Sequence, residues 1–293
     1  MLKASLQAVF VTFLWSTSWV LIKIGLGSIP PLLFAGLRYS LAFLILLLFY
    51  LRTSKIIEIR QLSRRDWLKL GVLGVIFYAL TQGSQFLGLL YLPAVTFSLM
   101  LNFSAVIIAL LGIAILKERL SGLQWVGIAI SLIGGIVFFY PFRFPELQAI
   151  GFLVAALALS ANAFSSILGR AINRSGKISA ITVTVVSMGI GGALLLIVGV
   201  ASQGLPDLGW REWSIVFWLA AVNTALAFTL WNHSLRTLSA AQSSIINNTM
   251  LVQIALLAWV FLGERISAVE AAGMAIALIG TLLVQAQPRK TGQ

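Results

Sequence analysis

The same four residue types recur at the same helical spacing in two distant segments. They are Ala94, Ser98, Asn102 and Val106, and then Ala240, Ser244, Asn248 and Val252. Residues four apart lie on one face of an α-helix. A hydroxyl and an amide on such a face can bind a polar solute, or they can hold two helices together by hydrogen bonds. Both interpretations stay open for the two serines and the two asparagines.

A third segment places a tyrosine and two glutamines on one helical face. Tyr78, Gln82 and Gln85 follow one another at spacings of four and three. Tyr78 lies about 16 Å along a helix from Trp67, which is the depth of the centre of a bilayer. Thr224 stands 146 residues after Tyr78. Amide and hydroxyl groups at this depth predict the wall of a polar cavity.

Two further segments carry residues that could line the same cavity. One contains Trp15 and Ser18, and the other contains Asn162 and Ser165. The serines could bind a solute or pack against a neighbouring helix. Trp15 could stack on a ligand, pack in the protein interior or anchor a helix at the membrane surface.

Arg38 is the ionisable residue that lies well inside an apolar segment, about 12 Å along a helix from Pro30. Its guanidinium could extend to the membrane surface or bind a backbone carbonyl. Alternatively, its paired N–H groups could hold the carboxylate of a substrate.

The composition indicates whether these residues belong to a membrane protein or to a soluble one. Of the 293 residues, 60% are hydrophobic and 10% are charged, and the mean hydropathy is +1.01. Such a chain has too little polar surface for a soluble globule, so it is expected in a bilayer. The net charge of +12 comes from scattered Lys and Arg residues, which argues against nucleic-acid binding. The chain has no cysteine, which excludes disulfides and thiolate metal sites.

The apolar runs predict ten transmembrane helices, the first retained and not cleaved as a signal peptide. They lie near residues 4–26, 30–51, 67–90, 93–116, 122–140, 149–169, 179–202, 212–235, 240–262 and 268–286. Fifteen Lys and Arg residues then face the side of the N-terminus, whereas four, Lys23, Arg143, Arg211 and Arg265, face the other side. The positive-inside rule therefore predicts that both termini are cytoplasmic.

The whole chain is a repeat with an offset of 146 residues. Arg65-Asp66-Trp67 aligns with Arg211-Glu212-Trp213, and the match continues without a gap to Gly134 and Gly280. Each copy, 1–146 and 147–293, holds five helices, so the second copy enters the membrane from the opposite side. Inverted repeats around a central site are typical of secondary transporters. A purely structural duplication is the alternative.

The segments "LKERL" and "LGERI", each followed by a Gly-rich helix with "IGG" or "IGT", resemble the paired EamA domains of the drug/metabolite transporter superfamily, as does Arg38 in "FAGLRYSLAFL". The resemblance implies a ten-helix transporter, usually an exporter. It also implies that spans 1, 3, 4, 6, 8 and 9 surround the cavity while spans 5 and 10 are peripheral. The proline that such domains often carry midway along spans 4 and 9 is absent here.

The acidic residues and the single histidine narrow the mechanism. All eight Asp and Glu residues lie in predicted loops or at span ends. Proton-driven efflux of cationic drugs commonly needs a carboxylate at the midplane, so that activity is disfavoured. No Walker A motif is present to hold ATP. His233 has no partner cluster in the sequence with which to form a metal or catalytic centre, so neither an enzyme nor a cofactor is expected.

The sequence thus predicts an all-α inner-membrane protein, ten helices in two inverted five-helix repeats, that carries small neutral or zwitterionic metabolites. The resemblance to the superfamily implies export, and among its members the exporters of amino acids, including aromatic ones, suit a site with amide, hydroxyl and aromatic groups but no buried acid. Proton-coupled efflux of drugs or other metabolites is the alternative, and a non-transporting receptor or scaffold is a third class. The expected partners are a small-molecule substrate and membrane lipid, without nucleic acid, and a monomer is compatible with the sequence. The predicted substrate-binding residues are Tyr78, Gln82, Gln85, Asn102, Thr224, Asn248, Ser98, Ser244, Asn162, Trp15 and Arg38.

Overall fold

The computed structural model describes residues 2–53, 55–116, 120–141, 146–174, 176–238 and 240–285. Ten helices in these ranges are long and apolar enough to cross a membrane, which confirms the predicted all-α membrane fold. In chain order, the helical elements are α1 (Leu2–Gly25), α2 (Pro31–Tyr50), α3 (Ile56–Gln61), α4 (Arg64–Leu73), η1 (Gly74–Gln82), α5 (Gly83–Tyr91), α6 (Ala94–Asn102), α7 (Ser104–Leu116), α8 (Gly122–Phe139), α9 (Glu146–Arg174), α10 (Ala180–Gln203), α11 (Trp210–Ala220), η2 (Ala221–Leu226), α12 (Ala227–Ser234), α13 (Ala240–Leu262) and α14 (Ala268–Gln285).

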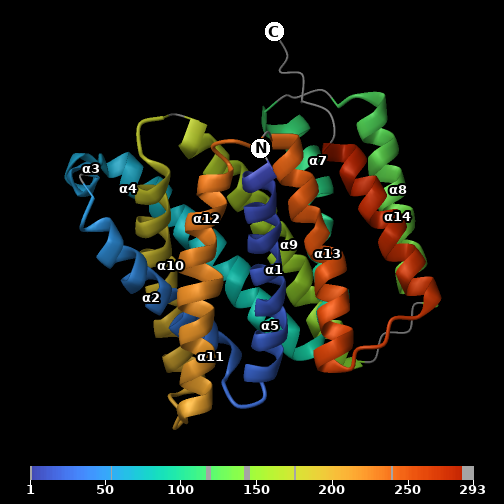
Figure 1. Cartoon of the computed structure of the whole chain (residues 1–293), viewed down its shortest axis with the longest axis horizontal. Helices are drawn as coiled ribbons and strands as arrows, with labels where there is room; N and C mark the ends of the chain where they lie inside the picture. The colour runs from blue at the N-terminus through green and yellow to red at the C-terminus, as the bar shows by residue number, and fades with distance from the viewer. Residues whose placement is uncertain are drawn as a thin grey trace.

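The helices form one bundle in which the two repeats are interleaved. Figure 1 shows α1 near the middle, α2 and α10 toward one edge, and α8 and α14 at the other. Helix α1 begins and α14 ends at the same end of the bundle, as an even number of spans requires. Below, this end is called the N-terminal side and the other end is called the opposite side.

Glycines bring α8 and α14 into direct backbone contact at the edge of the bundle. A Cβ atom added to Gly127 would lie 2.8 Å from the carbonyl oxygen of Gly280, and one added to Gly273 would lie 2.8 Å from that of Gly134. Gly127 and Gly134 precede Gly273 and Gly280 by 146 residues. Because lipid tails are as apolar as side chains, close backbone packing of this kind is a main source of helix association in membranes.

Spans 3 and 8 contain wider π-helical turns at equivalent places. The segments are η1 in span 3 and η2 in span 8. In each segment a threonine hydroxyl donates to a carbonyl five residues back, Thr81 to Ile76 at 2.9 Å and Thr224 to Leu219 at 2.8 Å. Regular helices were expected in both spans. The π turn rotates the residues that precede it relative to those that follow, and such turns occur frequently at functional sites.

Span 4 is interrupted although it has no proline. Helix α6 ends at Asn102, Phe103 forms a turn, and α7 begins at Ser104. Span 9 runs unbroken as α13. The interruption separates Asn102 from Val106, so the expected continuous stripe in span 4 is wrong at its last position. Val106 instead packs with Ile128 and Val284, away from the bundle centre.

Candidate functional site

A cavity of about 350 Å³ lies between the two repeats. Its wall comprises residues of spans 1 to 4, 6 and 8 to 10. Among the residues singled out in the sequence, those that line it are Trp15, Ser18, Arg38, Gln82, Gln85, Ser98, Asn102, Asn162 and Asn248. We call this space the central cavity.

Other predicted residues lie behind the cavity wall or outside the described part. Tyr78 is 3% exposed and packs its ring on Tyr39. Thr224 is fully buried and contacts Arg38. Ser165 is buried and donates to the carbonyl of Asn162. The side chain of Ser244 lies outside the described residues.

Arg38 is held firmly but keeps part of its guanidinium available. Its Nε donates to Thr224 Oγ1 at 3.0 Å, and the guanidinium carbon lies 5.1 Å from the ring centre of Tyr39 and 5.9 Å from that of Phe86. The side chain is 4% exposed and borders the central cavity. Within the described residues, the terminal N–H groups have no hydrogen-bond partner. A fixed guanidinium with free N–H groups can bind a carboxylate through two parallel hydrogen bonds.

Tyr39 was not predicted as a site residue, although it follows Arg38 directly. Its hydroxyl donates to Gln82 Oε1 at 2.7 Å, and both residues line the central cavity. This bond fixes the orientation of the Gln82 side-chain amide. The NH2 group of that amide is then free to donate to a solute. The sequence contained a weak signal for Tyr39, because a polar aromatic ring adjoined the buried arginine.

A chain of amides joins spans 4, 9 and 10 at the cavity wall. Asn102 Nδ2 donates to Asn248 Oδ1 at 3.4 Å, and these asparagines are related by the 146-residue repeat. Asn248 Nδ2 donates to Gln285 Oε1 at 2.6 Å, and Thr281 Oγ1 donates to Asn102 Oδ1 at 2.7 Å. The bond between the asparagines is long and therefore weak, so a polar solute can replace it at little cost.

Span 10 therefore contributes to the cavity, which corrects the expectation that it is peripheral. Gln285 lies in the wall, while the rest of α14 packs at the edge of the bundle against α8 (Figure 1). The expectation that span 10 is peripheral came from the resemblance to the family. The last residues of the helix were the missed signal, since a glutamine ends an otherwise apolar span.

Aromatic rings form a second part of the wall. Trp15 of α1 lies against Phe228 and Trp231 of α12, with ring centres 5.6 Å and 5.2 Å apart. Trp19 packs on Phe97 of α6 at 6.0 Å. Trp15, Trp19 and Phe228 face the central cavity. These contacts show that Trp15 serves packing within the bundle and is also accessible to a ligand.

Charged side chains tie the helices together on the opposite side. Lys23 Nζ donates to the carbonyls of Leu89 and Leu92 at the end of span 3. Glu264 accepts from the backbone N–H groups of Ala94 and Val95 at 2.7 Å and 3.1 Å. A carboxylate at a helix N-terminus and an ammonium at a helix C-terminus both match the helix dipole. Glu264 therefore holds the N-terminal end of α6.

Comparisons with known proteins bear on what such a cavity does. The profile of the EamA-like transporter family matches residues 2–140 and again residues 149–286. The chain is 25% identical to the "Uncharacterized transporter YoaV" of Bacillus subtilis, over 91% of both chains. It is 26% identical to the "Probable amino-acid metabolite efflux pump" of Salmonella typhimurium, over 95% of this chain and 93% of the relative. A protein of the same description from Escherichia coli is 27% identical over 78% of this chain and 77% of its own length.

A solved crystal structure supports the fold. It superposes with a TM-score of 0.68 at 21% sequence identity and covers 97% of both chains. At this identity the likeness concerns the fold alone. The family match also shows the general function, because it covers nearly the whole chain in two copies and its members are transporters. This chain is a multi-pass membrane transporter that belongs to the EamA-like transporter family, within the drug/metabolite transporter superfamily.

Proposed function

We propose that the chain carries amino acids, or metabolites of similar size and charge, through the central cavity. The observation that carries this proposal is the buried Arg38, whose free N–H groups border the cavity. A carboxylate is the substrate group that such a guanidinium binds best. Thr224 and the rings of Tyr39 and Phe86 hold it in place, so little side-chain entropy is lost when a substrate binds.

The remaining polar groups suit the other end of a zwitterion. Gln85 and Asn162 border the cavity, and within the described residues their amides have no hydrogen-bond partner. Amide oxygens can accept hydrogen bonds from an ammonium group without themselves being charged. No carboxylate of the described chain lines the cavity, which favours a neutral or zwitterionic substrate over a cationic drug.

The size of the cavity also favours a small metabolite. Its volume of about 350 Å³ is near the lower end of the range of roughly 300 to 1,000 Å³ for small-molecule sites. The aromatic wall formed by Trp15, Trp19 and Phe228 would contact an apolar or aromatic side chain. The amino-acid metabolite efflux relatives agree with this class.

For the mechanism, we propose that the two repeats rock about this site. On the opposite side, Lys23 bonds span 1 to the end of span 3, and Glu264 bonds the end of span 9 to the start of span 4. Their contacts must break when the cavity opens to that side. With the N-terminal side in the cytoplasm, as the charge distribution predicts, the opposite side is the exterior of an inner membrane. We expect transport by facilitated diffusion or exchange, without proton coupling, because the described cavity wall has no acid to carry a proton.

Counterflow in proteoliposomes tests the proposal. Vesicles loaded with an unlabelled amino acid should transiently accumulate labelled phenylalanine, methionine or threonine without any ion gradient. Arg38→Lys keeps the charge but loses the paired N–H geometry, and it should reduce the initial rate about a hundredfold if the carboxylate is bound bidentately. Arg211→Lys, an exposed position at a span end, is the matched control and should leave the rate unchanged.

Two results would overturn the proposal. Accumulation that requires an imposed pH gradient would replace exchange by proton coupling. Full activity of Arg38→Lys with every transported amino acid would remove Arg38 from the carboxylate site.

A further inference from the structure

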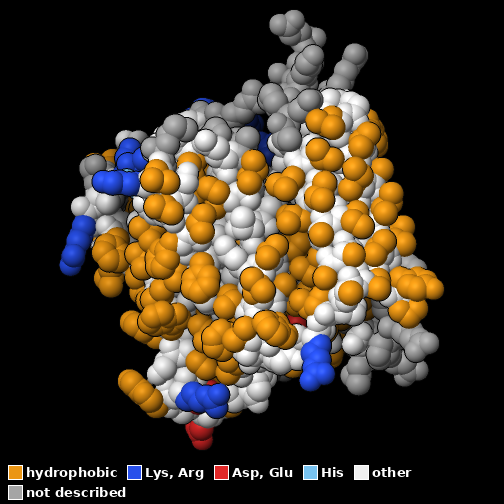
Figure 2. All heavy atoms as spheres, turned by 45° about the vertical axis from the view of Figure 1, so that its right-hand side comes forward, with side chains coloured by type: hydrophobic (Ala, Val, Ile, Leu, Met, Phe, Trp, Pro, Cys, Tyr) orange, Lys and Arg blue, Asp and Glu red, His pale blue; other side chains and the backbone are white. Residues whose placement is uncertain are grey.

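An apolar groove, distinct from the central cavity, opens at the side of the bundle between α13 and α14. Its volume is about 700 Å³, and it is lined by ten apolar residues and Arg265. Figure 2 shows apolar side chains over the middle of this side of the molecule, with charged side chains around its upper left and lower edges. Leu251 lines both the groove and the central cavity.

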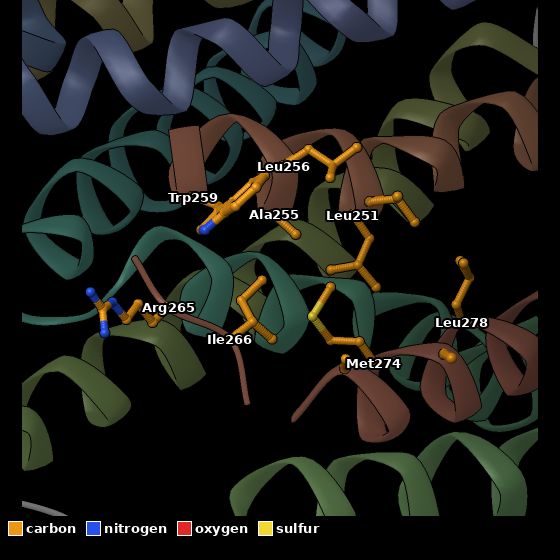
Figure 3. Close-up of a pocket in the computed structure, with 11 residues that line it drawn as sticks. Leu251, Ala255, Leu256, Trp259, Arg265, Ile266, Met274 and Leu278 are labelled. Carbon is orange, nitrogen blue, oxygen red and sulfur yellow. The ribbon is translucent and has the colours of Figure 1, made fainter. Parts of the chain in front are cut away.

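The groove has one charged end. Figure 3 places Arg265 at one end and Leu278 at the other, with Trp259, Ala255, Leu251 and Met274 between them. The indole nitrogen of Trp259 points toward the same end as the guanidinium. Within the described residues, neither the guanidinium nor the indole N–H has a hydrogen-bond or ion-pair partner.

In the part of the chain that the structure describes, neither neighbouring acid forms an ion pair with Arg265. Glu264 and Glu270 lie near it, because all three residues line a small pocket beside the groove. Glu264 is bound by the N–H groups of Ala94 and Val95, and Glu270 accepts from the N–H group of Ser267 at 2.7 Å. Neither carboxylate therefore occupies the N–H groups of the guanidinium, which can donate to an external anion.

The length of the groove matches one leaflet of a bilayer. Along α13 it extends from Leu251 to Trp259, which is about 12 Å of helix. Half of the hydrocarbon core is about 15 Å thick. Arg265 follows the end of α13 on the opposite side, and we expect lipid phosphates at the ends of the apolar spans. The apolar part then reaches toward the membrane centre.

We propose that this groove binds one acyl chain of a glycerophospholipid, with the lipid phosphate on Arg265 and Trp259. The guanidinium and the indole N–H supply hydrogen bonds and charge for the phosphate diester. Leu256, Val252 and Met274 supply the surface for the chain. The site is independent of the transported substrate, so it can fail while the proposed function stands.

The repeat provides matched controls for the test. Ala275→Phe places a ring inside the groove to obstruct an acyl chain, whereas Ala129→Phe places the same ring at the exposed position 146 residues earlier. Arg265→Gln removes the charged end, and Arg211→Gln removes another exposed arginine from the same side. The purified full chain is titrated with phosphatidylglycerol, or with diacylglycerol of the same acyl chains, and the complexes are counted by native mass spectrometry.

The expected result is one tightly bound phosphatidylglycerol per chain. Arg265→Gln should weaken its binding about fivefold, as expected for the loss of one arginine near lipid phosphate, while binding of diacylglycerol should not change. Ala275→Phe should abolish both. Ala129→Phe and Arg211→Gln should bind as the wild type does, and melting curves of all variants report folding. In a second measurement, phosphatidylglycerol should raise the Tm of the wild type but not that of a folded Ala275→Phe protein.

Three results would overturn the site. The first is equal binding of phosphatidylglycerol by the wild type and by Arg265→Gln. The second is equal loss in the Ala129→Phe and Ala275→Phe proteins. The third is a dimer whose contact is lost in Ala275→Phe, because the groove would then hold a second copy of the chain.

Discussion

The two repeats place a valine at the same position and bury it to different extents. Val106 of the first repeat is 5% exposed, whereas Val252 of the second is 45% exposed. Val106 packs with Ile128 of α8 and Val284 of α14. Val252 lines the open groove between α13 and α14. Because the two valines are identical, the difference comes from their surroundings. Span 4 is interrupted at Phe103 before Val106, whereas span 9 runs unbroken past Val252.

Such a difference is expected if the repeats exchange conformations during transport. In an inverted-repeat carrier, each half adopts in one state the packing that its partner adopts in the other. We therefore expect the state that opens to the opposite side to close the α13–α14 groove and to open its counterpart between α7 and α8. The variants that follow test this comparison.

The largest expected effect is at the glycine contact that the repeats share. Leucine in place of Gly134 would put its Cβ 2.6 Å from Ala277 Cα and 2.7 Å from the carbonyl oxygen of Gly273. The two helices must then separate, which we expect to cost about 3 kcal/mol or more. Thermal unfolding in detergent would measure the loss. Gly122→Ala is the control, since nothing lies within 4 Å of its added Cβ. A Gly134→Leu protein with an unchanged Tm would contradict the observed packing of α8 and α14.

The next effect concerns the two related asparagines. Asn102→Leu and Asn248→Leu each break the amide chain at the cavity. We expect each to lower the counterflow rate at least about tenfold while the folded yield stays nearly normal, as for lost contacts to the transported solute. Asn232→Leu, at an exposed position of α12, controls for the change in polarity. Normal flux in both cavity variants would mean that the asparagines serve only to pack the repeats.

Truncating Val106 and Val252 tests directly whether the two valines differ in burial. Val106→Ala should leave a space among packed side chains and cost about 1 kcal/mol. Val252→Ala removes the same atoms from a lipid-facing wall and should cost almost nothing. Chemical unfolding of both proteins in the same detergent measures the difference. Equal losses would show that the burial difference is not maintained in solution.

Much of the fold could be predicted because a bilayer imposes strong requirements. The length of the apolar runs determines the spans, and the 146-residue offset of Arg65 and Arg211 determines the inverted repeat. The cavity position of Gln82, Asn102 and Asn248 also followed from their depth and polarity. A polar amide at the midplane needs a polar partner, and this need is visible in the sequence.

Other features depend on geometry that the pattern of residue types does not contain. The π turns change which carbonyl each N–H group reaches, so Tyr78 lies behind the cavity wall although its α-helical spacing placed it with Gln82. Gln285 reaches the cavity because α14 leans toward Asn248 at one end. The burial of Val106 and the exposure of Val252 depend on the packing of the helices around them, which the identity of the two valines does not reveal.

The smallest expected effect compares two helix caps that differ in charge. Glu58 Oε2 accepts hydrogen bonds from Ser179 and Thr182 at the start of α10. Gln203 Oε1 accepts from the N–H groups of Leu32 and Leu33 at the start of α2. Leu33 precedes Ser179 by 146 residues, whereas Glu58 precedes Gln203 by 145. The two capped helix starts are therefore equivalent, and an ionisable cap in one repeat corresponds to a neutral cap in the other that is one position out of register.

Only the first cap should respond to pH. Hydrogen bonds from Ser179, and secondarily from Thr182, lower the pKa of Glu58 to about 2. Because the folded pKa lies below the unfolded one, the carboxylate stabilises the fold above about pH 4.5, and this contribution is lost as the pH falls toward 2. Glu58 is 23% exposed, so we expect of order 1 kcal/mol after solvent screening. Unfolding measured between pH 6 and pH 3 should lose a large part of this increment in the wild type but none of it in Glu58→Gln. Gln203→Glu should add a comparable dependence on pH, and its absence would mean that the two caps do not play equivalent roles in the two repeats.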